Sequence, residues 1–193
     1  MSAAAYLRAA AASVTLLAAA CASAPDRFYT LHTMPESAGP SSAHPRIHMQ
    51  MAVTVPVLVD RAELVVDTSS TEVQLLDHER WGAPLSDQVA RTLAGDIELR
   101  RPDILVGDHA YDQPAAPTIS VKVDIVRMSV RRGGPAQLEA HWRIVDKQAG
   151  IDKIDAATFA ATPASTTPAG IVDAYSETLS ALAARLVETL RAD

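Results

Sequence analysis

The chain has little of what would give it a covalent or metal-bound framework. Cys21 is the only cysteine among its 193 residues, so no disulfide can form within it. The six histidines are scattered, and none is paired at the spacing that metal sites use: His32, His44, His48, His78, His109 and His141. We therefore expect neither a disulfide scaffold nor a metal site.

Positive charge and enzyme motifs are also scarce. The formal net charge is -6 at pH 7, whereas a surface that binds nucleic acid needs a basic face to neutralise phosphates. There is no G-x-S-x-G nucleophile turn, no H-E-x-x-H helix and no glycine-rich phosphate loop. The sequence predicts no nucleic-acid partner, no cofactor and no catalytic residue. An envelope hydrolase stays open as an alternative, because convergent catalytic sites need only geometry.

The first twenty residues have the features of an export signal. Arg8 is their only charged side chain, and a run of small, mostly apolar residues follows from Ala9 to Ala20. That run is too short for a membrane-spanning helix, which needs about 20 apolar residues. We predict a signal peptide over residues 1–20 that is removed from the mature protein.

Cys21 directly follows this run, and its position indicates lipid attachment. Leu17-Ala18-Ala19-Ala20-Cys21 resembles a bacterial lipobox, in which the cysteine is acylated and becomes the mature N-terminus, although Ala18 stands where leucine is usual. Ordinary cleavage that leaves a free thiol is the alternative, but such a thiol is a liability in an oxidising compartment. Ala22 rather than aspartate follows, and resemblance to enterobacterial sorting rules then implies the periplasmic face of the outer membrane.

The rest of the chain divides into a linker and one globular domain. Residues 21–45 combine the lipid anchor, a short predicted strand over residues 27–31, and a tether rich in proline and serine over residues 32–45. Residues 46–193 have a length that suits a single domain. At up to about 3.3 Å per extended residue, the tether is expected to let the domain stand tens of ångströms off the bilayer.

Alternating apolar and polar residues predict the main strands. The alternation is regular over residues 47–55 and again over residues 119–125. From Val126 the apolar residues occupy the other phase, so a continuous strand would bury Arg127. We predict a bulge at this point, followed by a hairpin turn at Gly133-Gly134.

Two segments have the longer period of amphipathic helices. The first begins near Pro84 and repeats an apolar residue every fourth position, at Leu85, Val89, Leu93 and Ile97. The second runs from about Ala169 to Arg191 and has an apolar stripe along its whole length. Runs of strands with two helices predict a single α+β domain, in which a largely antiparallel sheet is covered by both helices, the second one long and C-terminal.

Two dense polar stretches are candidate contact sites. The first is His78-Glu79-Arg80-Trp81, which we expect where a strand meets a helix. Either Trp81 fills that junction while Glu79 and Arg80 face solvent, or Arg80 and Trp81 anchor a protein interface. The second stretch lies beside the Gly133-Gly134 turn and comprises Arg127, Arg131 and Arg132. It is either a solvated turn or a contact for lipid phosphates or an acidic protein face.

Several of these segments together resemble a known family. They are Arg27-Phe28-Tyr29-Thr30-Leu31 soon after the lipobox, Val57-Leu58-Val59-Asp60-Arg61, the run from His78 to Leu85, and the helix from Tyr175 to Leu190. In this order they are similar to the ABC-type transport auxiliary lipoproteins, the PqiC-like group. Ala62 departs from the pattern, since the family usually has proline there. Asp60 and Arg61 join His78 to Trp81 as candidate partner-contact or structural residues.

The resemblance implies a non-catalytic role in envelope lipid transport. Such lipoproteins accompany an MCE-domain protein and inner-membrane transporter components, and they support the movement of phospholipid or a related hydrophobic substrate between membranes. We therefore expect attachment to the membrane through N-terminal acyl chains, these protein partners, assembly with copies of itself, and a contribution to membrane integrity. A structural lipoprotein that links the outer membrane to another envelope complex is the alternative.

Overall fold

A computed structural model of the chain describes residues 24–34, 47–107 and 119–191, so Cys21 and most of the expected tether lie outside the described residues. The elements are β1 (Arg27–Tyr29), β2 (Ile47–Thr54), β3 (Glu63–Asp67), β4 (Val73–Trp81), α2 (Leu85–Arg100), β5 (Ile104–Val106), β6 (Ile119–Val130), β7 (Ala136–Asp146), β8 (Ile151–Ala161) and α3 (Pro168–Arg191). The predicted α+β domain with a long C-terminal helix is confirmed.

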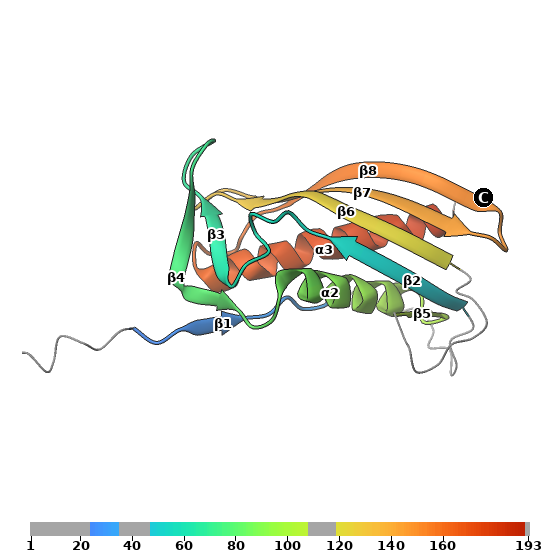
Figure 1. Ribbon diagram of the computed structural model, residues 1–193, viewed down its shortest axis with the longest axis horizontal. Helices are drawn as coiled ribbons and strands as arrows, with labels where there is room; N and C mark the ends of the chain where they lie inside the picture. The colour runs from blue at the N-terminus through green and yellow to red at the C-terminus, as the bar shows by residue number, and fades with distance from the viewer. Residues whose placement is uncertain (1–23, 35–46, 108–118, 192–193) are drawn as a thin grey trace, which may run out of the picture.

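The strands form two sheets rather than one. The larger has the order β5-β2-β6-β7-β8 and the smaller has the order β1-β4-β3. The long ladders β6–β7 and β7–β8 are antiparallel, as predicted, whereas β2 is parallel to both β5 and β6 and β1 is parallel to β4. In Figure 1 the small sheet stands at one end of the molecule, and β5 and the β7–β8 turn lie at the other end.

Both helices cover one face of the five-stranded sheet (Figure 1). The predicted stripe of α2 is buried throughout, because Leu85, Val89, Leu93 and Ile97 are at most 1% exposed. Residues of α3 such as Leu179 and Leu182 complete the core. Full burial of each such side chain contributes about 1.5–3 kcal/mol, so this apolar face holds the two helices on the sheet.

The predicted bulge in β6 is confirmed. The pairing with β7 shifts between Ile125, which lies opposite Ala140, and Arg127, which lies opposite Glu139. Val126 and Arg127 are both exposed while Ile125 and Met128 are both buried. The extra residue thus keeps the apolar side chains in the core on either side of the phase change. The hairpin turn is also confirmed, with Gly133 at a φ of 74° that favours glycine.

One strand extends further than the sequence predicted. β4 continues through Trp81, so the run from His78 to Trp81 lies within a strand and not at a junction. Within the described ranges, neither helix is both long and apolar enough to cross a membrane.

Candidate functional site

The strand next to the predicted lipid anchor is docked on the domain. β1 lies parallel to β4, with Phe28 opposite Arg80 and Tyr29 opposite Trp81. The backbone N–H of Gly82 donates a hydrogen bond to the Tyr29 carbonyl at 2.8 Å. The candidate stretch from His78 to Trp81 is therefore the surface to which the N-terminal strand binds.

Glu79 contacts two side chains of β1 from the inner side. The Tyr29 hydroxyl donates to Glu79 Oε2 at 2.6 Å, and the Arg27 guanidinium pairs with the other carboxylate oxygen. Burial, followed by the hydrogen bond to Glu79, raises the pKa of Tyr29. The expectation that Glu79 faces solvent is wrong, because its exposed fraction is 8%. The reason is the strand, in which alternate residues such as Glu79 and Trp81 point inward together.

Polar side-chain contacts on the outer side hold Asp26, the residue that precedes β1. His78 Nδ1 lies 3.1 Å from Asp26 Oδ1, and Arg80 Nε lies 2.9 Å from Asp26 Oδ2. Arg80 also approaches Glu63 of β3 at 3.7 Å, and Arg61 reaches the same carboxylate at 3.4 Å. Each exposed pair contributes only about 0–1 kcal/mol, but the four pairs share partners and together restrain the start of β1.

Trp81 and Asp60 have structural positions. The Trp81 side chain belongs to the core with an exposed fraction of 6%, so in this fold it fills the interior and is not available as an interface anchor. Asp60 Oδ1 accepts a hydrogen bond from the Ser86 N–H at 3.2 Å. It thereby satisfies one of the free amides at the start of α2, where Pro84 provides no side-chain cap.

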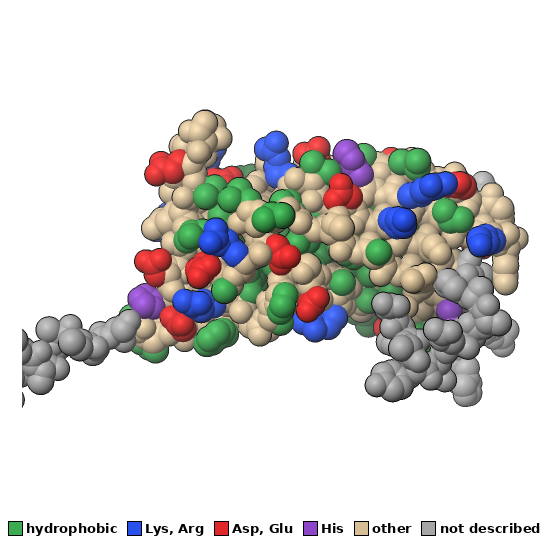
Figure 2. Space-filling model, viewed as in Figure 1, with side chains coloured by type: hydrophobic (Ala, Val, Ile, Leu, Met, Phe, Trp, Pro, Cys, Tyr) green, Lys and Arg blue, Asp and Glu red, His purple; other side chains and the backbone are tan. Residues whose placement is uncertain are grey.

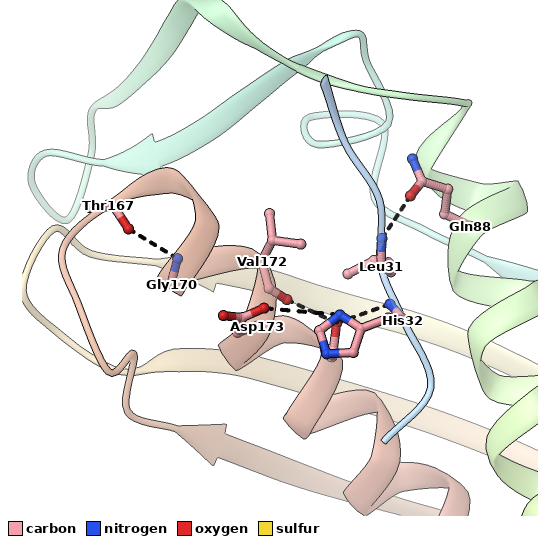
Figure 3. Close-up of polar contacts among 8 residues, drawn as sticks. Leu31, His32, Gln88, Thr167, Gly170, Val172 and Asp173 are labelled. Carbon is pink, nitrogen blue, oxygen red and sulfur yellow. Dashed lines mark hydrogen bonds and ion pairs between the residues drawn. The ribbon is translucent and has the colours of Figure 1, made fainter. Parts of the chain in front are cut away.

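The chain after β1 forms a strap, defined as residues 30–34, across both helices. Gln88 Oε1 of α2 accepts from the Leu31 N–H at 2.9 Å, and Ser176 Oγ of α3 accepts from the His32 N–H at 3.3 Å (Figure 3). Asp96 Oδ1 accepts from the Met34 N–H at 2.9 Å. All three accepting side chains are buried. Residues 32–34 are therefore bound to the domain. The sequence had predicted that a free tether begins at residue 32, and for these three residues that prediction is wrong.

Ser176, His32 and Asp173 lie close together but lack the geometry of a catalytic triad. His32 Nδ1 is 3.3 Å from Ser176 Oγ, and the same nitrogen is 4.0 Å from Asp173 Oδ1 (Figure 3). A triad uses the two imidazole nitrogens separately, one for the serine and one for the carboxylate. Ser176 is fully buried and donates to the Val172 carbonyl at 3.0 Å. This group gives no support to the hydrolase alternative. Within the described ranges, no cluster of three metal-binding side chains occurs.

The three arginines of the predicted basic tip separate into two positions. Arg127 lies at the bulge, 3.7 Å from Glu139. Arg131 and Arg132 are exposed at the β6–β7 turn, where Arg131 forms a backbone bridge to Asp67 and Arg132 reaches Gln74 of β4 at 3.5 Å. Arg131 also lines a pocket of about 160 Å³ with the loop before α3. The β6–β7 turn therefore adjoins the small sheet.

An apolar groove, which was not predicted from the sequence, lies between the two sheets. It has a volume of about 120 Å³ and is lined by Leu58, Val65, Val126 and Met128, among others. Leu58 is 54% exposed, Val126 is 44% exposed, and the neighbouring Val57 is 90% exposed. Figure 2 shows hydrophobic side chains gathered over β3 and its adjoining loop, with charges of both signs around them. The signal in the sequence was the apolar pair Val57-Leu58 in a loop.

Comparison with known proteins places this geometry in context. The family model described as an ABC-type transport auxiliary lipoprotein component matches residues 29–187. Among solved structures, an uncharacterised protein has 16% identity and a TM-score of 0.71, covering 86% of this chain and 99% of its own. Protein XCC0632 from Xanthomonas campestris has 16% identity and a TM-score of 0.62, covering 83% and 92%. These structures share the fold. None of the curated proteins matches.

Proposed function

The chain belongs to the family of ABC-type transport auxiliary lipoprotein components, and from this premise we propose that it is a non-catalytic lipoprotein subunit of an MCE-type envelope lipid transport system. Acyl chains on Cys21 attach it to the periplasmic face of the outer membrane. Its partners are the MCE-domain protein and the inner-membrane transporter components, and the assembly contributes to membrane integrity. The family match over residues 29–187 is the observation that carries this proposal.

The contacts of β1 support a role in which the lipid anchor is mechanically joined to the core. Glu79, His78 and Arg80 hold the segment that directly follows the predicted acylation site. The strap then connects this segment to both helices. A subunit built in this way stays close to its membrane while its remaining surface is free to bind other proteins.

The groove beside Leu58 and Val126 is the surface that we assign to the MCE-domain partner. Exposed large apolar side chains are normal when single, but a group of them around one groove marks an interaction site. Leu58 and Val126 line the groove, and the exposed Val57 precedes Leu58 in the same loop. The groove is small and open, which suits an inserted apolar side chain of a protein better than a whole lipid.

Photo-crosslinking in cells tests this function. A crosslinking residue at position 58 is expected to capture the MCE-domain protein, and the same residue at Ile154, which is 77% exposed on β8, serves as the control. A strain without the protein should also become more sensitive to detergents. Equal capture from both positions would contradict the assigned surface. Absence of any MCE-domain partner, together with unchanged detergent sensitivity, would contradict the proposed function and favour a structural lipoprotein.

A further inference from the structure

The distance between the predicted anchor and the fold is short. Asp26 is held by His78 and Arg80, and only five residues lead from Cys21 to Asp26. At up to about 3.6 Å per extended residue, Asp26 lies at most about 18 Å from an acylated Cys21. The expected tether over residues 32–45 cannot lengthen this distance, because it follows Asp26 in the chain. It joins two segments of the domain, the strap and β2.

This restraint fixes which end of the molecule meets the membrane. β1, β3 and β4 form one end, and β5 and the β7–β8 turn form the other (Figure 1). α3 runs between the two ends and, with 24 residues at 1.5 Å each, has a length of about 36 Å. An anchor within about 18 Å of Asp26 therefore brings the end with the small sheet to the bilayer and directs the other end away from it.

Phe28 is suited to contact the bilayer at this end. Arg27 and Tyr29 point toward Glu79, so Phe28, between them on the strand, points to the opposite side. Its exposed fraction is 67%, which is high for a phenylalanine in a folded strand. Phenylalanine is one of the residues that amphipathic surface segments bury at the boundary of headgroups and acyl chains.

The same end has two neighbouring exposed arginines, Arg131 and Arg132, that can contact lipid phosphates. Arg132 contacts Gln74 of β4, which lies six residues from Arg80 and hence about 20 Å from β1 along the strand. Arg131 is exposed beside it and lines the pocket of about 160 Å³. Of the acidic residues at this end, Asp26 and Glu63 are paired with Arg80, Asp67 forms a backbone bridge to Arg131, and Glu72 and Asp77 are exposed. Arginines near an anionic leaflet are attracted to lipid phosphates.

We propose that the end formed by β1, the β3–β4 hairpin and the β6–β7 turn lies against the bilayer surface, with Phe28 in the headgroup layer and Arg131 and Arg132 on lipid phosphates. This inference rests on the proposed acylation of Cys21. The lipid surface thus has three contacts with the protein: the acyl chains, one aromatic ring and a basic turn. The surface is recognised by its chemistry, anionic phosphate above an apolar layer.

Fluorescence quenching of the acylated full-length protein tests the orientation. The protein is reconstituted into vesicles of phosphatidylethanolamine and phosphatidylglycerol that contain brominated phosphatidylcholine. Phe28→Trp is expected to be quenched. Ile154→Trp, on β8 at a position that is 77% exposed compared with 67% for Phe28, should emit as it does in bromine-free vesicles. Trp81 and Trp142 are buried and give both variants the same background. Equal quenching of the two variants overturns the orientation.

Charge reversal tests the basic turn in the same vesicles. In the Phe28→Trp background, Arg132→Glu should lower the equilibrium constant for contact of the introduced tryptophan with the lipid surface about 5-fold or more. This factor corresponds to about 1 kcal/mol per arginine. Lys147→Glu, at the β7–β8 turn of the opposite end, should leave it unchanged. An equal response to both substitutions overturns the contact with lipid phosphates. A protein that does not float with vesicles overturns the anchor and this inference together, whereas one that floats without quenching of Phe28→Trp overturns only this inference.

Discussion

The Tyr29 hydroxyl donates a hydrogen bond of 2.6 Å to Glu79. This bond links β1, the strand nearest the predicted anchor, to β4, the strand that contains the run from His78 to Trp81. Two segments that are separated by 50 residues in sequence are thus joined at the edge of the small sheet. Glu79 also pairs with Arg27, so one buried carboxylate holds both inward side chains of β1. This relationship explains why the run from His78 to Trp81 is rich in charge although no catalysis is expected of it.

Substitution of Glu79 should release β1 while leaving the domain folded. Glu79→Gln removes the carboxylate that pairs with Arg27, and loss of a charge-assisted bond of this kind costs about 1–3 kcal/mol. The amide of Gly82 donates to the Tyr29 carbonyl, so its hydrogen exchange reports the docking of β1. We expect faster exchange at Gly82 in Glu79→Gln. In Asp77→Asn, the exposed neighbour on β4, exchange should stay as in the wild type; similar acceleration in both would argue against a specific role of Glu79.

Gly95 should show whether the strap packs against α2. A Cβ atom at this position would lie 2.5 Å from Thr33 Cγ2. Gly95→Ala in a free helix would stabilise the protein by about 1 kcal/mol, but here we expect that gain to be lost because Thr33 must shift. Thr33→Ser removes the clashing methyl group, so the double variant should recover the gain. Chemical denaturation of the four proteins measures this coupling, and simple additivity of the two substitutions would contradict the packing.

Tyr175 should make the protein less stable at alkaline pH. Burial, together with the negative charge of Asp67, raises the pKa of Tyr175 far above its ordinary value of about 10. In the unfolded chain the phenol ionises near pH 10 while the folded protein keeps it neutral. The unfolded state is thus favoured increasingly above pH 10, by up to about 1.4 kcal/mol per pH unit. Denaturation at pH values between 8 and 11 gives the free energy of unfolding at each pH. This free energy should fall less steeply with pH in Tyr175→Phe than in the wild type, and an equal slope in both proteins would count against ionisation of Tyr175 as the cause.

The bulge in β6 predicts an unusual tolerance to deletion. Removing Val126 should leave Arg127 outward and Met128 inward, because Val126 is the extra residue of the bulge. We expect deletion of Val126 to lower the free energy of unfolding by less than about 2 kcal/mol. Deletion of Met128 turns Val130 out of the core and should lower it by more than about 4 kcal/mol. Thermal unfolding of the two proteins makes the comparison. Equal losses would show that the phase change is not absorbed at Val126.

Local sequence patterns predicted most of the fold. The four-residue spacing from Leu85 to Ile97 identified α2, and the phase change at Val126 identified the bulge, because both depend on which face of an element is buried. The division into two sheets was not predictable in this way. It depends on pairings such as that of β1 with β4, which join segments far apart in the chain and leave no periodic signal.

The candidate site was predicted in part. Sequence reasoning selected Asp60, His78, Glu79, Arg80 and Trp81, but it could not assign Asp26, Arg27 and Tyr29 as their partners, since ion-pair partners are fixed only by the three-dimensional fold. The strap was missed for a related reason. Residues 32–34 have no apolar periodicity. They are held by hydrogen bonds that their backbone N–H groups donate, and such bonds leave no signal in the identity of the side chains.

The intact mass of the native protein, purified from the membrane fraction, shows directly whether Cys21 is the lipid anchor. We expect a mature chain that begins at Cys21 and carries the added mass of acyl chains, and a Cys21→Ala protein that leaves the membrane fraction. A chain that begins elsewhere, or a Cys21 without acyl mass in a protein that still fractionates with membranes, would contradict this expectation.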